Sequence, residues 1–232
     1  MHVTAIVVAA GEGQRFGGAV PKPYIEIAGR PMILRTLDRC FEAGGINDLI
    51  LVVAETELRR CKKLLTADCN LQPRQWRLQK GGATRQDSVK QGLEQLEPDV
   101  DLVMIHDGAR PLVSAALIDR CIELAREKGA VVAGIPVRDT IKVVSEDRWI
   151  QSTPERNSLW EIQTPQVFHK ALILEAHARA SQSRFQATDD AMLVEGMGKP
   201  VYVADGERTN FKITVPEDIL VAEALIREAY GG

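Results

Sequence analysis

Short apolar runs rich in β-branched residues alternate along this chain with longer segments that mix apolar and charged residues. Residues 3–8 form the first run, and their continuous apolar character is typical of a strand buried on both faces of a parallel sheet. The alternation predicts an α/β fold, Rossmann-like, with a mostly parallel, mixed and twisted sheet and helices on both faces. We expect further strands near residues 48–54, 76–79, 102–106, 130–137 and 201–204, and helices near residues 31–43, 55–65, 85–96, 114–128, 169–181, 189–196 and from 216 onward.

One segment interrupts this rhythm. Strand-like residues 140–144 and 149–151 flank the turn-forming residues 145–148, a pattern typical of a β-hairpin. A hairpin that protrudes from a compact domain has exposed edges that must be paired or covered. We therefore expect a homodimerisation arm at about residues 138–156. We expect the chain, this arm included, to form a single domain spanning residues 1–232, because a chain of this length that is 45% hydrophobic can bury one full core.

Charge and hydropathy exclude several classes of protein. The net charge is −3 and the isoelectric point is near 5.9, so no global basic field would hold a nucleic acid. No uncharged apolar stretch approaches the ~20 residues that span a bilayer, and no basic segment precedes the first strand as in a secretory signal. The cysteines include no C-x-x-C pair and the histidines are scattered, so neither a zinc site nor a redox dithiol is indicated. We expect a cytoplasmic protein without nucleic-acid or membrane partners.

A polar, glycine-rich segment follows the first strand, at the edge of an open α/β sheet where ligands bind. Gly11 and Gly13 allow a sharp turn that brings backbone N–H groups close to anionic oxygens. Phe16 stands where a dinucleotide-binding G-x-G-x-x-G motif needs glycine, and the G-K-[ST] ending of a P-loop is missing. Arg15 and Lys22 add two cations, which suit the charge that builds on a phosphate under attack. The segment predicts a triphosphate-binding loop; the alternative is a tight turn with two solvated cations.

A second glycine-containing loop joins an expected short strand to a helix. Gly81 and Gly82 would direct backbone N–H groups toward a ligand, and Ser88 would direct its hydroxyl there. The alternative is structural, because Thr84 and Asp87 have the residue types that cap a helix start. The loop alone leaves these two interpretations evenly balanced.

Charged residues at the remaining loops give the other candidates. Asp107 ends an apolar strand, where a carboxylate can share Mg²⁺ with substrate phosphates; the alternative is an ion pair with Arg110 that braces the turn. Thr140 and Arg156 flank the hairpin and have donors suited to a second phosphate, unless they are only solvated surface residues. Lys212 interrupts another expected apolar strand, where lysine more often protects a sheet edge than takes part in catalysis.

These segments belong to a longer set of motifs that occur in a fixed order. The set comprises Ala9-Ala10-Gly11-x-Gly13-x-Arg15, Pro21-Lys22, Gly81-Gly82-x-x-Arg85-x-Asp87-Ser88, His106-Asp107-x-Ala109-Arg110-Pro111, Asp139-Thr140, Thr164-Pro165-Gln166, Thr188-Asp189-Asp190-Ala191 and Lys212-Ile213-Thr214-x-Pro216-Glu217-Asp218. Any one of these motifs is weak, but together they resemble the 2-C-methyl-D-erythritol 4-phosphate cytidylyltransferase family over essentially the whole chain. The resemblance implies a nucleotidyltransferase of non-mevalonate isoprenoid biosynthesis. In such an enzyme the phosphate of methylerythritol phosphate attacks the α-phosphorus of CTP and releases pyrophosphate.

The resemblance also implies catalytic and nucleotide-binding residues. Arg15 and Lys22 would stabilise the charged transition state, and Lys212 would orient the attacking phosphate against the α-phosphate. No covalent enzyme intermediate is expected. The nucleotide would lie along a set of small residues, one arginine and one serine: Ala9, Ala10, Gly11, Gly13, Gly82, Arg85 and Ser88.

The acceptor site implied by the resemblance draws on two subunits. Asp107 would lie beside Mg²⁺ and the hydroxyls of the acceptor. The hairpin would cross to a second subunit, so that Thr140 and Arg156 would serve the partner's active site, joined by Arg110 and Thr164. Substrates are therefore expected to be CTP and a small polyol phosphate.

Three alternatives stay open from the sequence. A ribitol-5-phosphate cytidylyltransferase shares the glycine loop, the Pro-Lys step and the hairpin, and a hexose-phosphate nucleotidyltransferase would use another base. A nucleotide-binding module without catalysis is the third, although the joint presence of Arg15, Lys22 and Lys212 argues against it. The sequence ends at Gly232, so we expect a monofunctional enzyme without a fused cyclodiphosphate synthase domain.

Overall fold

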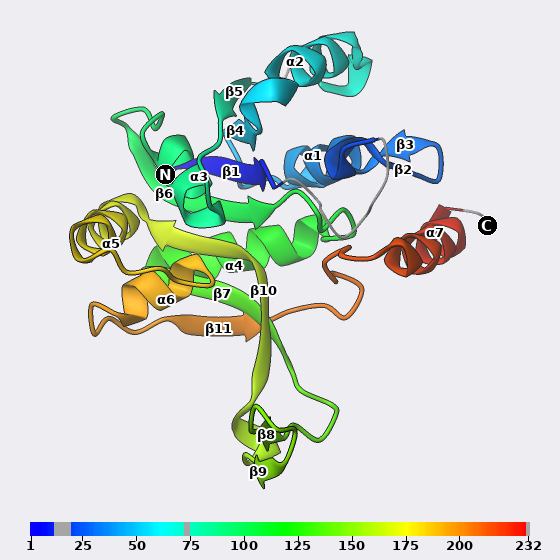
Figure 1. Cartoon of the computed structure of the whole chain (residues 1–232). Helices are drawn as coiled ribbons and strands as arrows, with labels where there is room; N and C mark the ends of the chain where they lie inside the picture. The colour runs from blue at the N-terminus through cyan, green and yellow to red at the C-terminus, as the bar shows by residue number, and fades with distance from the viewer. Residues whose placement is uncertain (12–19, 72–74, 231–232) are drawn as a thin grey trace.

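The computed structural model describes residues 1–11, 20–71 and 75–230. Within these ranges a seven-stranded sheet has the order β11-β7-β10-β6-β1-β4-β5, and helices cover both of its sides (Figure 1). Its strands are β1 (His2–Ala9), β4 (Asp48–Val53), β5 (Trp76–Lys80), β6 (Val100–Asp107), β7 (Ala130–Pro136), β10 (Trp160–His169) and β11 (Tyr202–Asp205). Neighbouring strands are parallel except for β10, which runs antiparallel to β6 and β7. The predicted mostly parallel, mixed sheet is confirmed.

The helices follow the predicted order along the chain. They are α1 (Met32–Glu42), α2 (Leu58–Ala67), α3 (Arg85–Leu93), α4 (Ala115–Lys128), α5 (Lys170–Ser183), α6 (Asp190–Glu195) and α7 (Pro216–Tyr230). Ser114 caps α4 as expected, because its hydroxyl accepts the N–H of Leu117 at 3.0 Å. In the described part of the chain, no helix is long and apolar enough to cross a membrane.

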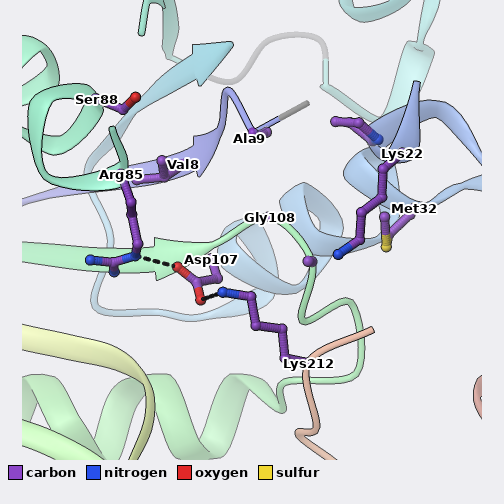
Figure 2. Close-up of a pocket in the computed structure, with 12 residues that line it drawn as sticks. Val8, Ala9, Lys22, Met32, Arg85, Ser88, Asp107, Gly108 and Lys212 are labelled. Carbon is purple, nitrogen blue, oxygen red and sulfur yellow. Dashed lines mark hydrogen bonds and ion pairs between the residues drawn. The ribbon is translucent and has the colours of Figure 1, made fainter. Parts of the chain in front are cut away.

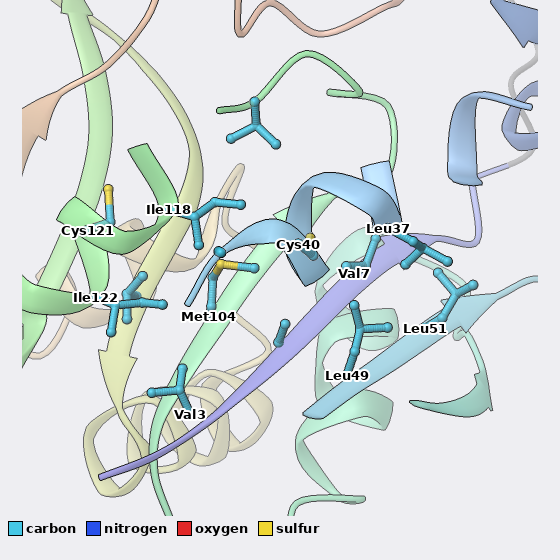
Figure 3. Close-up of a cluster of buried hydrophobic side chains, with 14 of the residues drawn as sticks. Val3, Val7, Leu37, Cys40, Leu49, Leu51, Met104, Ile118, Cys121 and Ile122 are labelled. Carbon is cyan, nitrogen blue, oxygen red and sulfur yellow. The ribbon is translucent and has the colours of Figure 1, made fainter. Parts of the chain in front are cut away.

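The alternation of side chains along the strands divides the core into two layers. Val3, Ala5 and Val7 of β1 face the layer formed with α1, α2 and α4, part of which Figure 3 shows. Ile6 faces the opposite layer, formed with α3, α5 and α6. Because each fully buried aliphatic side chain contributes roughly 1.5–3 kcal/mol, these two layers hold the strand ends in fixed positions.

The central strand β10 was not predicted from the sequence. Its Gln166 pairs with Ile105 of β6, so the strand lies in the middle of the sheet. Pro165 has no N–H to give to a ladder and normally marks a sheet edge or a break. The pairing with β7 accommodates this residue by a shift in register between Ile162 and Gln166. The interruption explains why the segment resembles a loop in the sequence.

The chain between β11 and α7 is a loop, so the strand expected around Lys212 is wrong. Ile213 donates its N–H to the carbonyl of Ala109 at 2.9 Å, which ties this loop to the end of β6. The Asp218 carboxylate accepts the N–H and the hydroxyl of Thr214, which stabilises the start of α7. The helix then packs against the small hairpin of β2 (Glu26–Ile27) and β3 (Arg30–Pro31). Lys212 therefore reaches the strand ends from a loop rather than from a strand.

The predicted hairpin is present between β7 and β10. Its strands are β8 (Val143–Val144) and β9 (Ile150–Ser152), and it projects away from the body of the sheet (Figure 1). The Trp149 side chain is 76% exposed and that of Ile150 is 64% exposed. An apolar surface on a projecting arm is typical of an interaction site.

Candidate active site

A pocket opens where β1 and β6 end, at the edge of the sheet where the sequence predicts ligand binding (Figure 2). The wall combines cationic side chains, one carboxylate and small residues: Val8, Ala9, Gly11, Lys22, Pro23, Met32, Arg85, Ser88, Asp107, Gly108, Ala109 and Lys212. Most of the predicted catalytic and nucleotide-binding residues are thus brought together. Gly13 and Arg15 lie outside the described residues, so their roles stay predictions.

Asp107 is paired with cations on both sides. Its Oδ1 accepts a hydrogen bond from Arg85 Nε at 3.0 Å, and its Oδ2 lies 2.8 Å from Lys212 Nζ (Figure 2). Burial alone would raise the pKa of Asp107, but Arg85 and Lys212 outweigh burial and hold this pKa well below its ordinary value. The carboxylate is therefore ionised. Its described ion-pair partners come from distant parts of the chain, rather than from Arg110 as the structural alternative predicted.

Arg85 reaches Asp107 from the first turn of α3. Thr84 and Asp87 form a reciprocal capping box at this helix start, so the capping expected from these two residue types is present. The Arg85 guanidinium also pairs with Asp190, at 2.7 Å from Nη1 to Oδ2. Burial would lower the pKa of Arg85, but Asp190 and Asp107 raise it above its ordinary value. The contact with Asp190 was not predicted from the sequence.

The glycine pair before α3 lies close to the end of β1. A Cβ on Gly81 would come 2.4 Å from the Cβ of Ala10, so only glycine fits this approach. The Gly82 N–H donates to the Ser88 hydroxyl at 3.2 Å, and the Gly81 N–H donates to a carbonyl at the end of β4. Both N–H groups therefore donate hydrogen bonds to other groups of the protein in this structure. Nucleotide contacts by Ala10, Gly82 and Ser88 stay predictions.

Two lysines enter the pocket from separate elements. Lys22 begins a short 3-10 helix after the glycine loop, and Lys212 lies on the loop before α7. Figure 2 shows both side chains extended toward the space beside Gly108. Lys212 is 41% exposed at its side chain, so it pairs with Asp107 while remaining accessible to a ligand. Two ammonium groups beside a carboxylate form a site for a multiply charged anion.

A buried polar network braces the strand end that carries Asp107. The Thr164 hydroxyl accepts the Asp107 N–H at 3.0 Å and donates to His106 Nδ1 at 3.0 Å. His106 Nε2 donates to the carbonyl of Arg110, and burial lowers the pKa of His106 to about 4, so the ring is neutral. Asn210 donates from Nδ2 to the Thr164 carbonyl at 2.9 Å. The Thr164 hydroxyl thus serves the protein interior here, and a contact with the acceptor stays a prediction.

The residues predicted to serve a partner subunit lie apart from the pocket of their own chain. Thr140 and Arg156 are exposed on the arm, outside the described pocket wall, and Arg156 donates to the carbonyl of Arg138 at 3.2 Å. Arg110 donates from Nη1 to the Asn210 carbonyl at 2.6 Å. Its buried Nε has no hydrogen-bond partner among the described residues, and Arg110 is not part of the described pocket wall. A contact of the arm residues with the acceptor therefore stays a prediction.

Fold and pocket together define the class of the protein. An α/β sheet with an ionised carboxylate and several cations at the carboxyl ends of its parallel strands belongs to proteins that bind and transform phosphate-bearing ligands. The sequence model of 2-C-methyl-D-erythritol 4-phosphate cytidylyltransferases matches residues 3–228, and the chain belongs to this family. The resemblance inferred from the motifs is confirmed.

Individual relatives agree over the full length of the chain. A 2-C-methyl-D-erythritol 4-phosphate cytidylyltransferase from Desulforamulus reducens is 42% identical over 226 residues, which cover 97% of this chain and 96% of the relative. The crystal structure of 4-diphosphocytidyl-2C-methyl-D-erythritol synthase from Anaerococcus prevotii has a TM-score of 0.86 at 34% identity, covering 97% of this chain and 98% of that one. The 2-C-methyl-D-erythritol 4-phosphate cytidylyltransferase structure from Thermus thermophilus has a TM-score of 0.79 at 35% identity, covering 98% and 100%.

Proposed function

We infer that this chain transfers a cytidylyl group from CTP to 2-C-methyl-D-erythritol 4-phosphate. An oxygen of the acceptor phosphate attacks the α-phosphorus of CTP, and the bond from that phosphorus to the oxygen bridging the β-phosphorus breaks. Pyrophosphate leaves with the electron pair, and the other product is 4-diphosphocytidyl-2-C-methyl-D-erythritol. The observation that carries this inference is the pocket in which Asp107 stands between Arg85 and Lys212, in a chain of this family.

The chain's own contribution to the reaction is positioning and electrostatic stabilisation. The nucleophile is a phosphate oxygen that is already ionised, so no general base is needed. The difficulty is that one anion must approach another, and charge then grows on the oxygens of the α-phosphate. Lys22 and Lys212 offset this charge from fixed positions in the pocket, as Arg15 would from the glycine loop. Arg85 and Ser88 would contact the nucleotide.

We propose Mg²⁺ as the cofactor, with Asp107 as its protein ligand. Among the described residues, no group of three or more His, Cys, Asp and Glu side chains could hold a metal ion. One ionised carboxylate nevertheless fits Mg²⁺, which is commonly bound by one or two carboxylates together with substrate phosphates and water. When bound, the ion would neutralise charge on the phosphates. EDTA should therefore abolish turnover, and excess Mg²⁺ should restore it.

We propose that two copies exchange arms and that each arm completes the acceptor site of the other copy. The exposed Trp149 and Ile150 support an interface with another protein surface. Thr140 and Arg156 on the arm would then add donors for the acceptor phosphate, a role suited to a bidentate guanidinium. Both substrates are charged metabolites that do not cross membranes, which supports a cytoplasmic location.

Pyrophosphate release by the purified protein tests the function. The assay contains CTP and Mg²⁺ with methylerythritol 4-phosphate, with ribitol 5-phosphate, or with no acceptor. We expect rapid release with methylerythritol 4-phosphate and little with the other two. A preference for ribitol 5-phosphate would overturn the acceptor assignment but keep the chemistry. Silence with both acceptors would contradict the catalytic proposal.

A further inference from the structure

Asp190 is a buried carboxylate that the proposed reaction does not use. Its side chain is 1% exposed, and it comes from the motif Thr188-Asp189-Asp190-Ala191 at the start of α6. Oδ2 pairs with Arg85 Nη1 at 2.7 Å, and Oδ1 lies 3.1 Å from His177 Nε2. A buried carboxylate is strongly unfavourable unless cations and donors surround it. The arrangement therefore needs an explanation beyond the start of a helix.

The position of Asp190 is fixed relative to the strand that carries Asp107. The backbone N–H groups of Asp190 and Ala191 both donate to Gln166 Oε1, each at 3.2 Å. Gln166 lies on β10 and pairs there with Ile105, two residues before Asp107 on β6. Movements of Asp190 relative to the pocket floor are thus restricted by the sheet itself.

Arg85 connects the two carboxylates. Its Nε donates to Asp107 and its Nη1 donates to Asp190, so two neighbouring edges of one rigid, planar guanidinium are held by different acids. The charges then alternate from Asp190 through Arg85 and Asp107 to Lys212. Asp107 receives a single N–H from this arginine, from Nε, and Arg85 Nη2 is buried without a hydrogen-bond partner among the described residues. The Oδ2 of Asp107 stays directed at Lys212 and the pocket.

We propose that Asp190 is a positioning residue for cytidylyl transfer, which orients Arg85 and through it the carboxylate of Asp107. This inference rests on the proposed function. Among the described residues Asp190 is not itself part of the pocket wall, which it reaches only through Arg85, and on this proposal it does not contact the substrates. Without the Asp190 charge, the Arg85 guanidinium would lose the contact that fixes its Nη1, and the Asp107 carboxylate that Arg85 holds would shift relative to Lys212 and the reacting phosphates.

The test is a double-mutant cycle of Asp190→Asn and Asp107→Asn, measured as pyrophosphate release. Asp190→Asn alone should lower kcat about tenfold and change the KM for CTP by less than about threefold, because the affected groups act on the reacting phosphates. In the Asp107→Asn background the same change should have less than about a twofold effect, since Asp190 acts through Asp107. Additive effects, or a variant that loses thermal stability but keeps kcat, would overturn the proposal.

Asp189→Asn is the matched control. Asp189 is the neighbouring residue and caps α6 by accepting the N–H of Met192 at 3.0 Å, but it contacts Gln166 rather than Arg85. The Asp189→Asn variant should lower the Tm of the protein and have only a small effect on kcat. In the double variant, this small effect should simply add to the effect of Asp107→Asn. If Asp190→Asn does not fold, Asp190→Glu replaces it in the cycle, because glutamate keeps the negative charge but displaces the carboxylate. Its effect on kcat should likewise not add to that of Asp107→Asn. A silent wild-type enzyme would overturn the proposed function, whereas an active wild type with additive variants would overturn this role alone.

Discussion

The pocket and the arm differ in which kind of side chain they bury and which kind they expose. In the pocket, charged groups are buried and matched, with Asp107 held between Arg85 and Lys212. On the arm, apolar groups are exposed to water, and Trp149 and Ile150 are among the most exposed large apolar residues of the described part of the chain. Matched charges need no further partner to be stable, whereas exposed apolar surface is stabilised only when something covers it.

This difference indicates which part of the active site is complete in one chain. The charges of Arg85, Asp107 and Lys212 are organised by contacts within the chain, so on the proposed function they need little rearrangement when the reaction begins. The acceptor side is proposed to use Thr140 and Arg156, which lie outside the described pocket wall of their own chain. Variants of the pocket should therefore act within a subunit, and variants of the arm should act across subunits.

Lys22→Ala should give the largest effect. Removing one fixed cation from a site where charge develops typically lowers turnover about 100- to 1000-fold. A pure nucleotide sensor would lose binding only, so a loss concentrated in kcat identifies an enzyme. Steady-state kinetics and CTP calorimetry measure the two parameters separately. Lys63→Ala, which removes an exposed lysine from α2, should leave both unchanged. A normal kcat for Lys22→Ala would contradict the role assigned to Lys22.

Arg156→Ala should raise the KM for the acceptor about tenfold or more and leave the KM for CTP nearly unchanged. The physical reason is that the proposed contact is a charge-assisted pair with the acceptor phosphate alone. Initial rates at varied concentrations of each substrate measure this split, with Arg59→Ala on α2 as an exposed arginine control. Equal effects on both KM values would remove this assignment.

Mixing Lys22→Ala with Arg156→Ala tests whether the arms cross between chains, provided that the acceptor is kept well below its wild-type KM, where both variants have little activity. After subunit exchange, about half of the dimers formed from Lys22→Ala and Arg156→Ala chains are mixed, and each has one intact site. Activity should therefore recover to about a quarter of the wild-type value. Heterodimers that are confirmed by mass spectrometry and remain inactive would show that each site is built within one chain.

Trp149→Glu should weaken the dimer without unfolding the subunit. A charge at this 76% exposed position adds no cost to an isolated chain, but it must lose water in an interface. We expect the dissociation constant to rise about tenfold or more by analytical ultracentrifugation, with little change in subunit structure by circular dichroism. Leu220→Glu is the matched control, because Leu220 is a similarly exposed apolar residue on α7. An unchanged dimer for Trp149→Glu would exclude the arm from the interface.

Local patterns predicted much of this molecule, and distant contacts account for what they missed. The first strand, the Ser114 cap and the arm depend on neighbouring residues, so the sequence is sufficient to predict them. The partners of Asp107 could not be predicted in this way. Proximity along the chain favoured Arg110, whereas the fold brings Arg85 and Lys212 to this carboxylate from separate elements. Strand β10 was missed for a related reason, because its pairing is set by β6 and β7 on either side.

His2→Gln should give the smallest effect and sharpen the contrast between ion pairs that serve catalysis and those that serve stability. His2 lies at the other end of β1 from the pocket, with Nε2 2.5 Å from Asp48 and Nδ1 3.1 Å from Asp99. Hydrogen bonds to Asp48 and then Asp99 raise the pKa of His2 above its ordinary value of 6.5. Its stabilisation is therefore fully present below 6.5 and lost as pH rises through the folded-state pKa. Urea unfolding should show a deficit of at most about 1 kcal/mol near pH 6 that disappears near pH 9, with kcat unchanged, and a deficit independent of pH would contradict the assignment.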